Sequence, residues 1–156
     1  MDAEAALTPS HKDELRLWLR LLTCANLMGA ELRRRLRDTF GTTLPRFDLL
    51  AALDRSEDGM TLGEVSRRMM VSNGNVTGLA ARLEAEGLVE RSAEAADRRS
   101  VRLRLTARGR REFHRQSAAH EEWVAELLSG LAPAERAALH RLLGAAKSSI
   151  RTGVAA

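Results

Sequence analysis

The sequence has no tyrosine, one cysteine and only 3% aromatic residues in a chain of 156. A single cysteine, Cys24, excludes a framework of internal disulfides. With few aromatic residues, the core must come from Leu, Ala, Val and Met, a composition that suits helices. No apolar run approaches the ~18 residues that cross a membrane, and the opening MDAEAALTPS lacks the layout of a secretory signal. We therefore expect a helical, cytoplasmic protein.

Lysine is also scarce, because only two of the 25 basic residues are Lys. The formal net charge is +4, and the positive excess lies in residues 60–110, which hold ten arginines and six acidic residues. A coding bias toward Arg explains the choice of residue but not its clustering. A local excess of this kind is typical of proteins that bind the phosphate backbone of nucleic acids.

Helical periodicity predicts a first helix of about 28 residues, capped by Ser10 and stopped by Gly41. Its middle, LWLRLLTCANLMGA, is apolar around most of its circumference, which indicates contact with a partner chain as well as with its own core. A second helix begins near Leu44-Pro45. Thr61 and Glu64 then form a capping box, and Ser72 caps a longer helix after about three connecting residues, which predicts a helix-turn-helix.

Alternation of apolar and polar residues predicts two strands, LVERS and SVRLRL, joined by the turn AEAADR. Arg102 and Arg104 share one face of the second strand, where they bind phosphates or are solvated at an exposed sheet edge. Thr106 then caps another helix, and Pro133 begins a last one that we expect to fray toward Arg151. The predicted fold class is mostly α with a small β-hairpin wing.

Residues 61–109, TLGEVSRRMMVSNGNVTGLAARLEAEGLVERSAEAADRRSVRLRLTARG, resemble the MarR family of bacterial transcription regulators. The likeness lies in LEAEGLVER, in the Asp-Arg-Arg of the wing and in the L-T-x-x-G that follows it. The resemblance implies a winged helix-turn-helix (44–106) and an obligate homodimer held together by N-terminal (1–43) and C-terminal (107–156) helices, as one intertwined domain. The first helix also resembles regulators of hydroxycinnamate and aromatic-acid degradation.

The second helix of the helix-turn-helix carries the predicted base contacts. The amides of Asn73 and Asn75 fit adenine, and Thr77 fits a thymine methyl or a phosphate, in a major groove. Gly74 and Gly78 share one helix face, which either approaches DNA closely or packs on the preceding helix. The predicted DNA contacts are Ser72, Asn73, Gly74, Asn75, Thr77, Gly78, Arg82, Arg98 and Arg99.

For the wing, the resemblance implies that Asp97 stabilises the tip and that Arg99, more than Arg98, inserts into a minor groove. We expect a palindromic operator with half-sites ~10 bp apart and an affinity that falls steeply with salt.

The resemblance also implies an effector pocket between the dimer helices and the winged lobe. Residues of suitable chemistry are Trp18, Asn26, Arg46, Phe47 and His114, although a role as a core or solvated residue is favoured for each of them. The run Arg33–Arg35 either meets the phosphates of a coenzyme A or forms a solvated helix face. No cofactor is expected.

These features predict a DNA-binding regulator that represses a catabolic operon and is released by a small aromatic acid or its CoA thioester. The sequence lacks GxSxG, P-loop and HExxH motifs, so we do not expect an enzyme. Two alternatives of the same fold stay open. A metal sensor would use His114 and Glu121, and a redox sensor would use Cys24, which we expect to be buried as a small hydrophobe.

Overall fold

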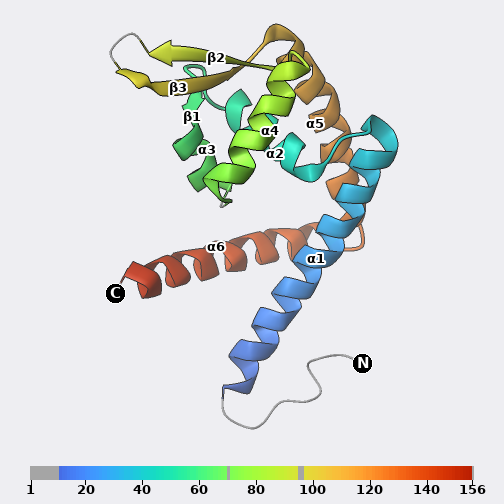
Figure 1. The fold of residues 1–156 in the computed structure, drawn as a ribbon. Helices are drawn as coiled ribbons and strands as arrows, with labels where there is room; N and C mark the ends of the chain where they lie inside the picture. The colour runs from blue at the N-terminus through green and yellow to red at the C-terminus, as the bar shows by residue number, and fades with distance from the viewer. Residues whose placement is uncertain (1–10, 70, 95–96, 156) are drawn as a thin grey trace. The chain divides into compact units, whose positions relative to one another are not determined.

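The computed structural model describes residues 11–69, 71–94 and 97–155, except for the side chains of residues 73, 94 and 97–100. Within that part, the mostly helical chain with a small antiparallel sheet confirms the predicted fold class (Figure 1). The chain divides into two compact units, residues 1–120 and residues 121–156. The elements are α1 (Lys12–Phe40), α2 (Leu44–Asp54), β1 (Met60–Thr61), α3 (Leu62–Met69), α4 (Asn73–Ala85), β2 (Val89–Glu94), β3 (Asp97–Leu105), α5 (Ala107–Leu127) and α6 (Pro133–Ala155).

The two ends of α1 differ in how well the sequence predicts them. The N-cap is His11, at φ 59° and without a side-chain hydrogen bond, so the predicted cap at Ser10 is wrong; Ser10 itself lies outside the described residues. At the other end, Gly41 adopts φ 63° and its amide donates to the Arg37 carbonyl at 2.9 Å. Glycine enters this left-handed conformation without a Cβ penalty, and the predicted stop is confirmed.

Capping side chains begin the next helices where the sequence predicts. The Thr61 amide donates to Glu64 Oε2 at 2.8 Å, and the Glu64 amide donates to Thr61 Oγ1 at 3.2 Å, which completes the capping box. Ser72 Oγ accepts from the Asn75 amide at the start of α4. Helices α3 and α4 are therefore separated by residues 70–72 alone, and the helix-turn-helix is confirmed.

The sheet contains one strand more than the sequence predicts. Its order is β1-β3-β2, with Leu103 of β3 paired to Met60 on one side and to Arg91 on the other. A two-residue strand is too short to show alternation, which is why β1 is missed. Because β3 lies between β1 and β2 at Arg102, the predicted exposed edge is wrong at that residue, whereas Arg104 pairs with Glu90 of β2 and is exposed. Strands β2 and β3 also extend into the predicted turn, up to Glu94 and from Asp97.

The core of the first unit joins α1, the helix-turn-helix and the sheet. Its fully buried side chains are Leu36, Leu49, Leu50, Leu53, Leu83, Leu103, Val65, Val76 and Val89. In the second unit, α6 begins at Pro133 as predicted and is helical to Ala155, so the fraying predicted near Arg151 is not observed. None of the helices in the described ranges is long and apolar enough to cross a membrane.

A close backbone contact fixes the start of α5 against the wing. Thr106 Oγ1 accepts from the Gly109 amide at 2.9 Å, which confirms the predicted cap, and the Thr106 amide donates to the Leu88 carbonyl at 3.1 Å. A Cβ added to Gly109 would lie 1.9 Å from that same Leu88 oxygen. Only glycine lets α5 approach β2 this closely.

Candidate nucleic-acid interface

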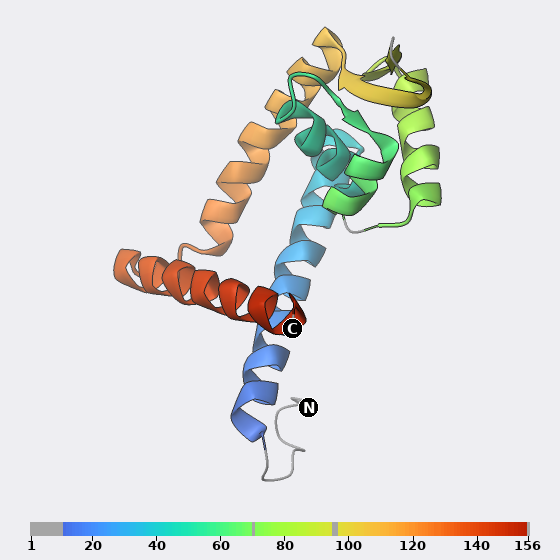
Figure 2. The same ribbon diagram turned by 90° about the vertical axis from the view of Figure 1, so that its left-hand side faces the viewer.

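Helix α4 has one buried face and one face made of small residues. It buries Val76, Ala80 and Leu83 against the lobe. The opposite face is exposed and consists of Gly74, Gly78, Ala81 and Ala85. A Cβ on Gly74 or Gly78 would meet no heavy atom of the described residues within 4 Å. Among the described residues these glycines therefore do not pack on the preceding helix, and Figure 2 shows α4 on the outer side of the lobe, away from α5.

Polar side chains flank this small-residue face. Asn75, Thr77 and Arg82 are all exposed on α4, and Ser72 stands at its N-cap. The side chain of Asn73 lies outside the described residues. An exposed helix with polar side chains beside a bare backbone can enter the ~12 Å major groove of B-DNA, where base edges are distinguishable. The predicted DNA contacts on α4 whose side chains the structure describes therefore lie on the solvent-exposed side of the helix.

Arg102 of the wing has a structural role that the sequence did not predict. Arg102 Nη1 donates to the Gly59 carbonyl at 3.2 Å and lies 3.9 Å from Glu64 Oε2, so this side chain ties β3 to the turn before β1. Arg104 is exposed. The side chains of Asp97, Arg98 and Arg99 lie outside the described residues, although their backbone belongs to β3.

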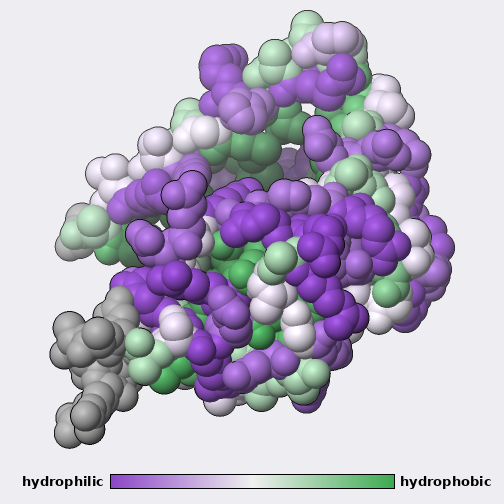
Figure 3. Space-filling view, turned by 90° about the horizontal axis from the view of Figure 1, so that it is seen from above, coloured by the Kyte–Doolittle hydropathy of each residue, from purple (hydrophilic) through white to green (hydrophobic). Residues whose placement is uncertain are grey.

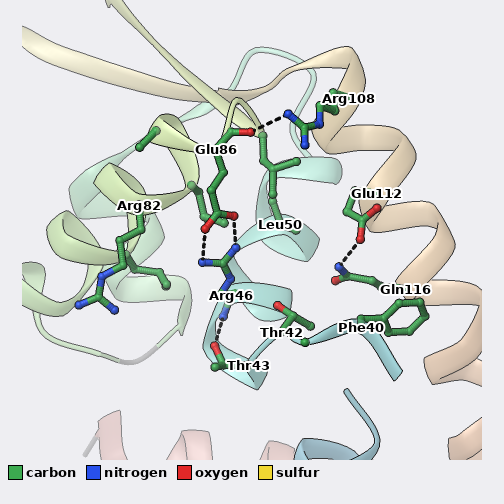
Figure 4. Close-up of a pocket in the computed structure, with 15 residues that line it drawn as sticks. Phe40, Thr42, Thr43, Arg46, Leu50, Arg82, Glu86, Arg108, Glu112 and Gln116 are labelled. Carbon is green, nitrogen blue, oxygen red and sulfur yellow. Dashed lines mark hydrogen bonds and ion pairs between the residues drawn. The ribbon is translucent and has the colours of Figure 1, made fainter. Parts of the chain in front are cut away.

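A cavity of about 820 Å³ lies within the first unit, between the end of α1, α2, the end of α4 and α5 (Figure 4). On one side, Arg46 Nη1 donates to Glu86 Oε1 at 3.0 Å, and its Nη2 donates to Glu86 Oε2. The Arg46 guanidinium lowers the pKa of the Glu86 carboxyl below its usual value. Arg108 Nη1 donates to the backbone carbonyl of Glu86 at 3.0 Å. The end of α4 is therefore held from both α2 and α5.

On the α5 side of the cavity, Gln116 is buried, with only 3% of its surface exposed. Its Nε2 donates to Glu112 Oε1 at 2.9 Å, whereas its Oε1 accepts no hydrogen bond from any residue that the structure describes. Glu112 also accepts from Arg115 Nη2 at 2.7 Å, and this bond lowers the pKa of the Glu112 carboxyl. Sequence reasoning missed these residues, although Arg108, Glu112 and Gln116 recur every four residues, a spacing that places them on one helix face.

Of the five effector-pocket residues predicted from the sequence, only Arg46 lines this cavity. Phe47 is buried; its ring stacks on His120 at a centroid distance of 4.7 Å and packs at a tilt against Phe113 at 5.5 Å. His114 Nε2 lies 3.1 Å from Asp54 Oδ1. Trp18 and Asn26 are exposed on α1. Within the described part of one chain, these side chains do not form a common site.

The remaining sequence hypotheses concern a redox role for Cys24, a phosphate-binding role for Arg33–Arg35 and a metal site. Cys24 is exposed in the single chain, so the expected burial is not observed within it. Arg34 and Arg35 each donate to Glu31 at 2.7 Å, and they lower the pKa of the Glu31 carboxyl to about 2, with Arg34 the larger cause. Among the described residues, no three His, Cys, Asp or Glu side chains lie together as metal ligands would.

Comparison with known proteins agrees with this geometry. Residues 40–100 match the model of the MarR family. The chain is 37% identical over 97 residues to the transcriptional activatory protein BadR of Rhodopseudomonas palustris, a match that covers 61% of this chain and about half (55%) of BadR. A MarR family transcriptional regulator from Silicibacter pomeroyi has a TM-score of 0.76 and 33% identity, and the match covers 92% of this chain and 99% of that one.

The S. aureus MepR–DNA complex shares the fold, with a TM-score of 0.72 at 22% identity over 83% of this chain and 94% of MepR. The family model covers the elements from the end of α1 through the helix-turn-helix to the wing. The chain belongs to the MarR family of winged-helix transcriptional regulators.

Proposed function

We propose that this protein is a homodimeric, DNA-binding transcriptional regulator that inserts α4 into the major groove. The observation that carries the proposal is the open face of Gly74, Gly78, Ala81 and Ala85, which lets the α4 backbone approach base edges closely. MepR, a protein of the same fold, is known in complex with DNA. We propose that the protein acts by binding DNA, and we propose no catalytic activity for it.

The proposed DNA contacts include residues whose side chains the structure describes and residues that are proposed from the sequence alone. Ser72, Asn75, Thr77 and Arg82 are exposed beside the small-residue face. Asn73, Arg98, Arg99 and the wing-stabilising Asp97 enter the proposal from the sequence. Figure 3 shows the end of the winged lobe that carries the sheet, where hydrophilic side chains cover most of the surface. Such a surface suits a polar, charged partner such as a DNA backbone.

Exposed apolar side chains support the homodimer. On α1, Leu17, Trp18 and Leu27 are 58%, 57% and 67% exposed in the single chain, and Leu15 and Leu22 join them. Large apolar patches on one chain mark interaction sites. On α6, taken alone, the exposed apolar side chains are Leu139, Leu142, Leu143, Ile150 and Val154. The proposal keeps residues 1–43 and 107–156 as dimerisation segments around the winged region 44–106.

The proposal extends to regulation. A small aromatic acid or its CoA thioester releases the protein from a palindromic operator and so relieves repression of a catabolic operon. The likeness of the first helix to regulators of aromatic-acid degradation supports this ligand class. Because BadR is named as an activator, a reporter assay of the regulated promoter must register changes of either sign.

Fluorescence anisotropy tests the DNA-binding proposal directly. Purified protein is titrated onto duplex DNA from upstream of its own gene, and onto a random duplex, at about 50 and 200 mM salt. If six to ten phosphates are contacted, the affinity should fall by about 10³–10⁵-fold between these concentrations. Arg99→Ala should weaken binding, whereas Arg55→Ala, at the exposed end of α2, should not. Absence of binding to either duplex at low salt would refute the proposal.

A further inference from the structure

Arg102, in the middle of β3, joins the wing to the helix-turn-helix at two points. Its Nη1 donates to the Gly59 carbonyl at 3.2 Å and lies 3.9 Å from Glu64 Oε2 in the first turn of α3. The same Gly59 carbonyl accepts from Ser56 Oγ at 2.7 Å. Only 25% of the Arg102 side chain is exposed. The guanidinium is therefore engaged with acceptors of its own chain, unlike an arginine that extends into solvent toward a phosphate.

Arg102 also marks the point at which the sheet narrows from three strands to two. The two residues of β1 pair with Leu103 and Arg102 of β3. From Val101 outward to Asp97, β3 is paired with β2, and the register is irregular near Glu94. Figure 1 shows β2 and β3 extending past β1. A two-stranded ribbon twists more than a larger sheet and is at best marginally stable by itself, so the direction of the wing depends on how the ribbon is held at Arg102.

Both points that Arg102 reaches are themselves fixed. Gly59 adopts φ 77°, and a Cβ there would collide with a carbonyl oxygen of β3, so this turn packs directly on the strand. Glu64 is held by its capping box with Thr61. The hydrogen bond from the Thr61 amide lowers the pKa of the Glu64 carboxyl, and the Arg102 guanidinium lowers it further. Arg102 thus connects the wing to a charged and well-anchored part of the lobe.

We propose that Arg102 is a positioning residue for DNA recognition: it fixes the angle between the wing and helices α3 and α4, and so directs Arg99 into the minor groove. Arg99 lies three residues beyond Arg102, about 10 Å along a strand that rises ~3.3 Å per residue. A tilt of ~20° at Arg102 would displace that position by about 3–4 Å, which exceeds the range of hydrogen-bond distances. The inference rests on the proposed function, because it concerns how the wing of that DNA-binding site is held.

Two variants interrupt this connection in different ways. In anisotropy on the upstream duplex, Arg102→Gln should bind about tenfold more weakly, because a charge-assisted hydrogen bond is lost. Glu64→Gln keeps the capping box, since glutamine also serves at that position, but it loses the ion pair and should bind about twofold to fivefold more weakly. The direction of this change is informative, because removal of a negative charge by itself favours binding to DNA.

Arg111→Gln is the matched control, since Arg111 is exposed on α5 and the substitution removes the same charge as Arg102→Gln. It should leave the affinity for DNA unchanged. Far-UV circular dichroism confirms that each variant is folded. If Arg102→Gln does not fold, Glu64→Gln is carried through the same measurements in its place.

A double-mutant cycle with Arg99→Ala distinguishes positioning from direct contact. If Arg102 acts through Arg99, Arg102→Gln should weaken binding no further once residue 99 is alanine. The slope of log affinity against log salt should then be the same for Arg99→Ala and for the double variant. A direct phosphate contact of Arg102 would instead reduce the magnitude of that slope by about 0.9 in either background, and this result would overturn the proposal.

Footprinting at saturating protein separates the wing from α4. Hydroxyl radicals attack sugars along the minor groove, whereas dimethyl sulfate methylates guanine N7 in the major groove. Arg102→Gln should lose the same hydroxyl-radical protection that Arg99→Ala loses and should keep the guanine protection that α4 gives. Loss of both protections, or of neither, would contradict a role limited to the wing.

The same measurements separate this inference from the proposed function. Loss of all DNA binding in the wild type refutes the proposed function. DNA binding by the wild type, together with an unaffected Arg102→Gln or a Glu64→Gln that binds more tightly, refutes the positioning role and leaves the regulator standing.

Discussion

A methyl group added to the outward face of α4 should change stability and DNA affinity in opposite directions. In Gly78→Ala, the new Cβ meets no described heavy atom within 4 Å, so the folded chain accommodates it without a clash. Replacing a helix-interior glycine by alanine stabilises a helix by about 0.8–1.0 kcal/mol. We therefore expect the free energy of unfolding to rise by about 1 kcal/mol, which for a chain of this size corresponds to a Tm about 2–4 °C higher.

The same methyl group should weaken DNA binding if the α4 backbone lies against base edges. An additional methyl in a closely packed interface costs about 1–3 kcal/mol, which lowers the affinity by a factor of about 5 to 140. Thermal unfolding measured by circular dichroism gives the first quantity, and anisotropy on the upstream duplex gives the second. Both use one protein concentration, because dimerisation contributes to the apparent stability.

Gly144→Ala is the matched control, since Gly144 lies inside α6, is exposed and likewise has no described atom within 4 Å of a Cβ. It should gain the same stability and leave DNA affinity unchanged. A Gly78→Ala protein that is stabilised and binds DNA as tightly as the wild type would show that this face of α4 does not approach DNA. The reasoning about the small-residue face would then be refuted.

Three further predictions concern stability, assembly and pH. Gly109→Ala should lower the free energy of unfolding by about 1–3 kcal/mol in urea denaturation, because its Cβ would lie 1.9 Å from the Leu88 oxygen. Leu27→Asp should raise the dimer dissociation constant at least about tenfold in sedimentation analysis, since Leu27 is 67% exposed on one chain. Burial lowers the pKa of the His120 imidazole, so the unfolded chain takes up the proton first and stability falls as the pH drops below about 6.5; His120→Phe keeps the stack on Phe47 and should reduce that fall.

Each of these predictions has a result that contradicts it. Wild-type stability in Gly109→Ala would mean that α5 and β2 separate at no cost. An unchanged sedimentation profile for Leu27→Asp would exclude this side chain from the dimer interface. For His120, an NMR titration midpoint at or above 6.5 would contradict the effect of burial, and an unaltered pH slope in His120→Phe would assign the slope to other groups.

Elements whose signals are local were predictable. Caps at Thr61, Ser72 and Thr106 act through hydrogen bonds that span three residues, so their spacing in the chain is their geometry. The glycine stop at Gly41 is local in the same sense. Ser10 was a misleading signal, because helix α1 begins after His11 without any side-chain cap.

The candidate site was less predictable because its contacts join distant segments. Arg46 and Glu86 are 40 residues apart, and Arg102 and Gly59 are 43 apart. Nothing in the surrounding sequence distinguishes these arginines from the exposed ones at positions 67 and 68. The predicted effector residues had suitable chemistry, but the periodicity of a helix does not show which distant element each face meets.

Local patterning was enough to establish the helix-turn-helix, the wing and the arginine-rich middle of the chain, since periodicity, caps and charge are properties of neighbouring residues. The folding of distant segments onto one another established three other features. It placed β3 at the centre of the sheet, left the glycine face of α4 open, and enclosed Gln116 in a cavity with Arg46 and Arg108. These features depend on which surfaces are buried against each other, and burial is a property of the packed chain.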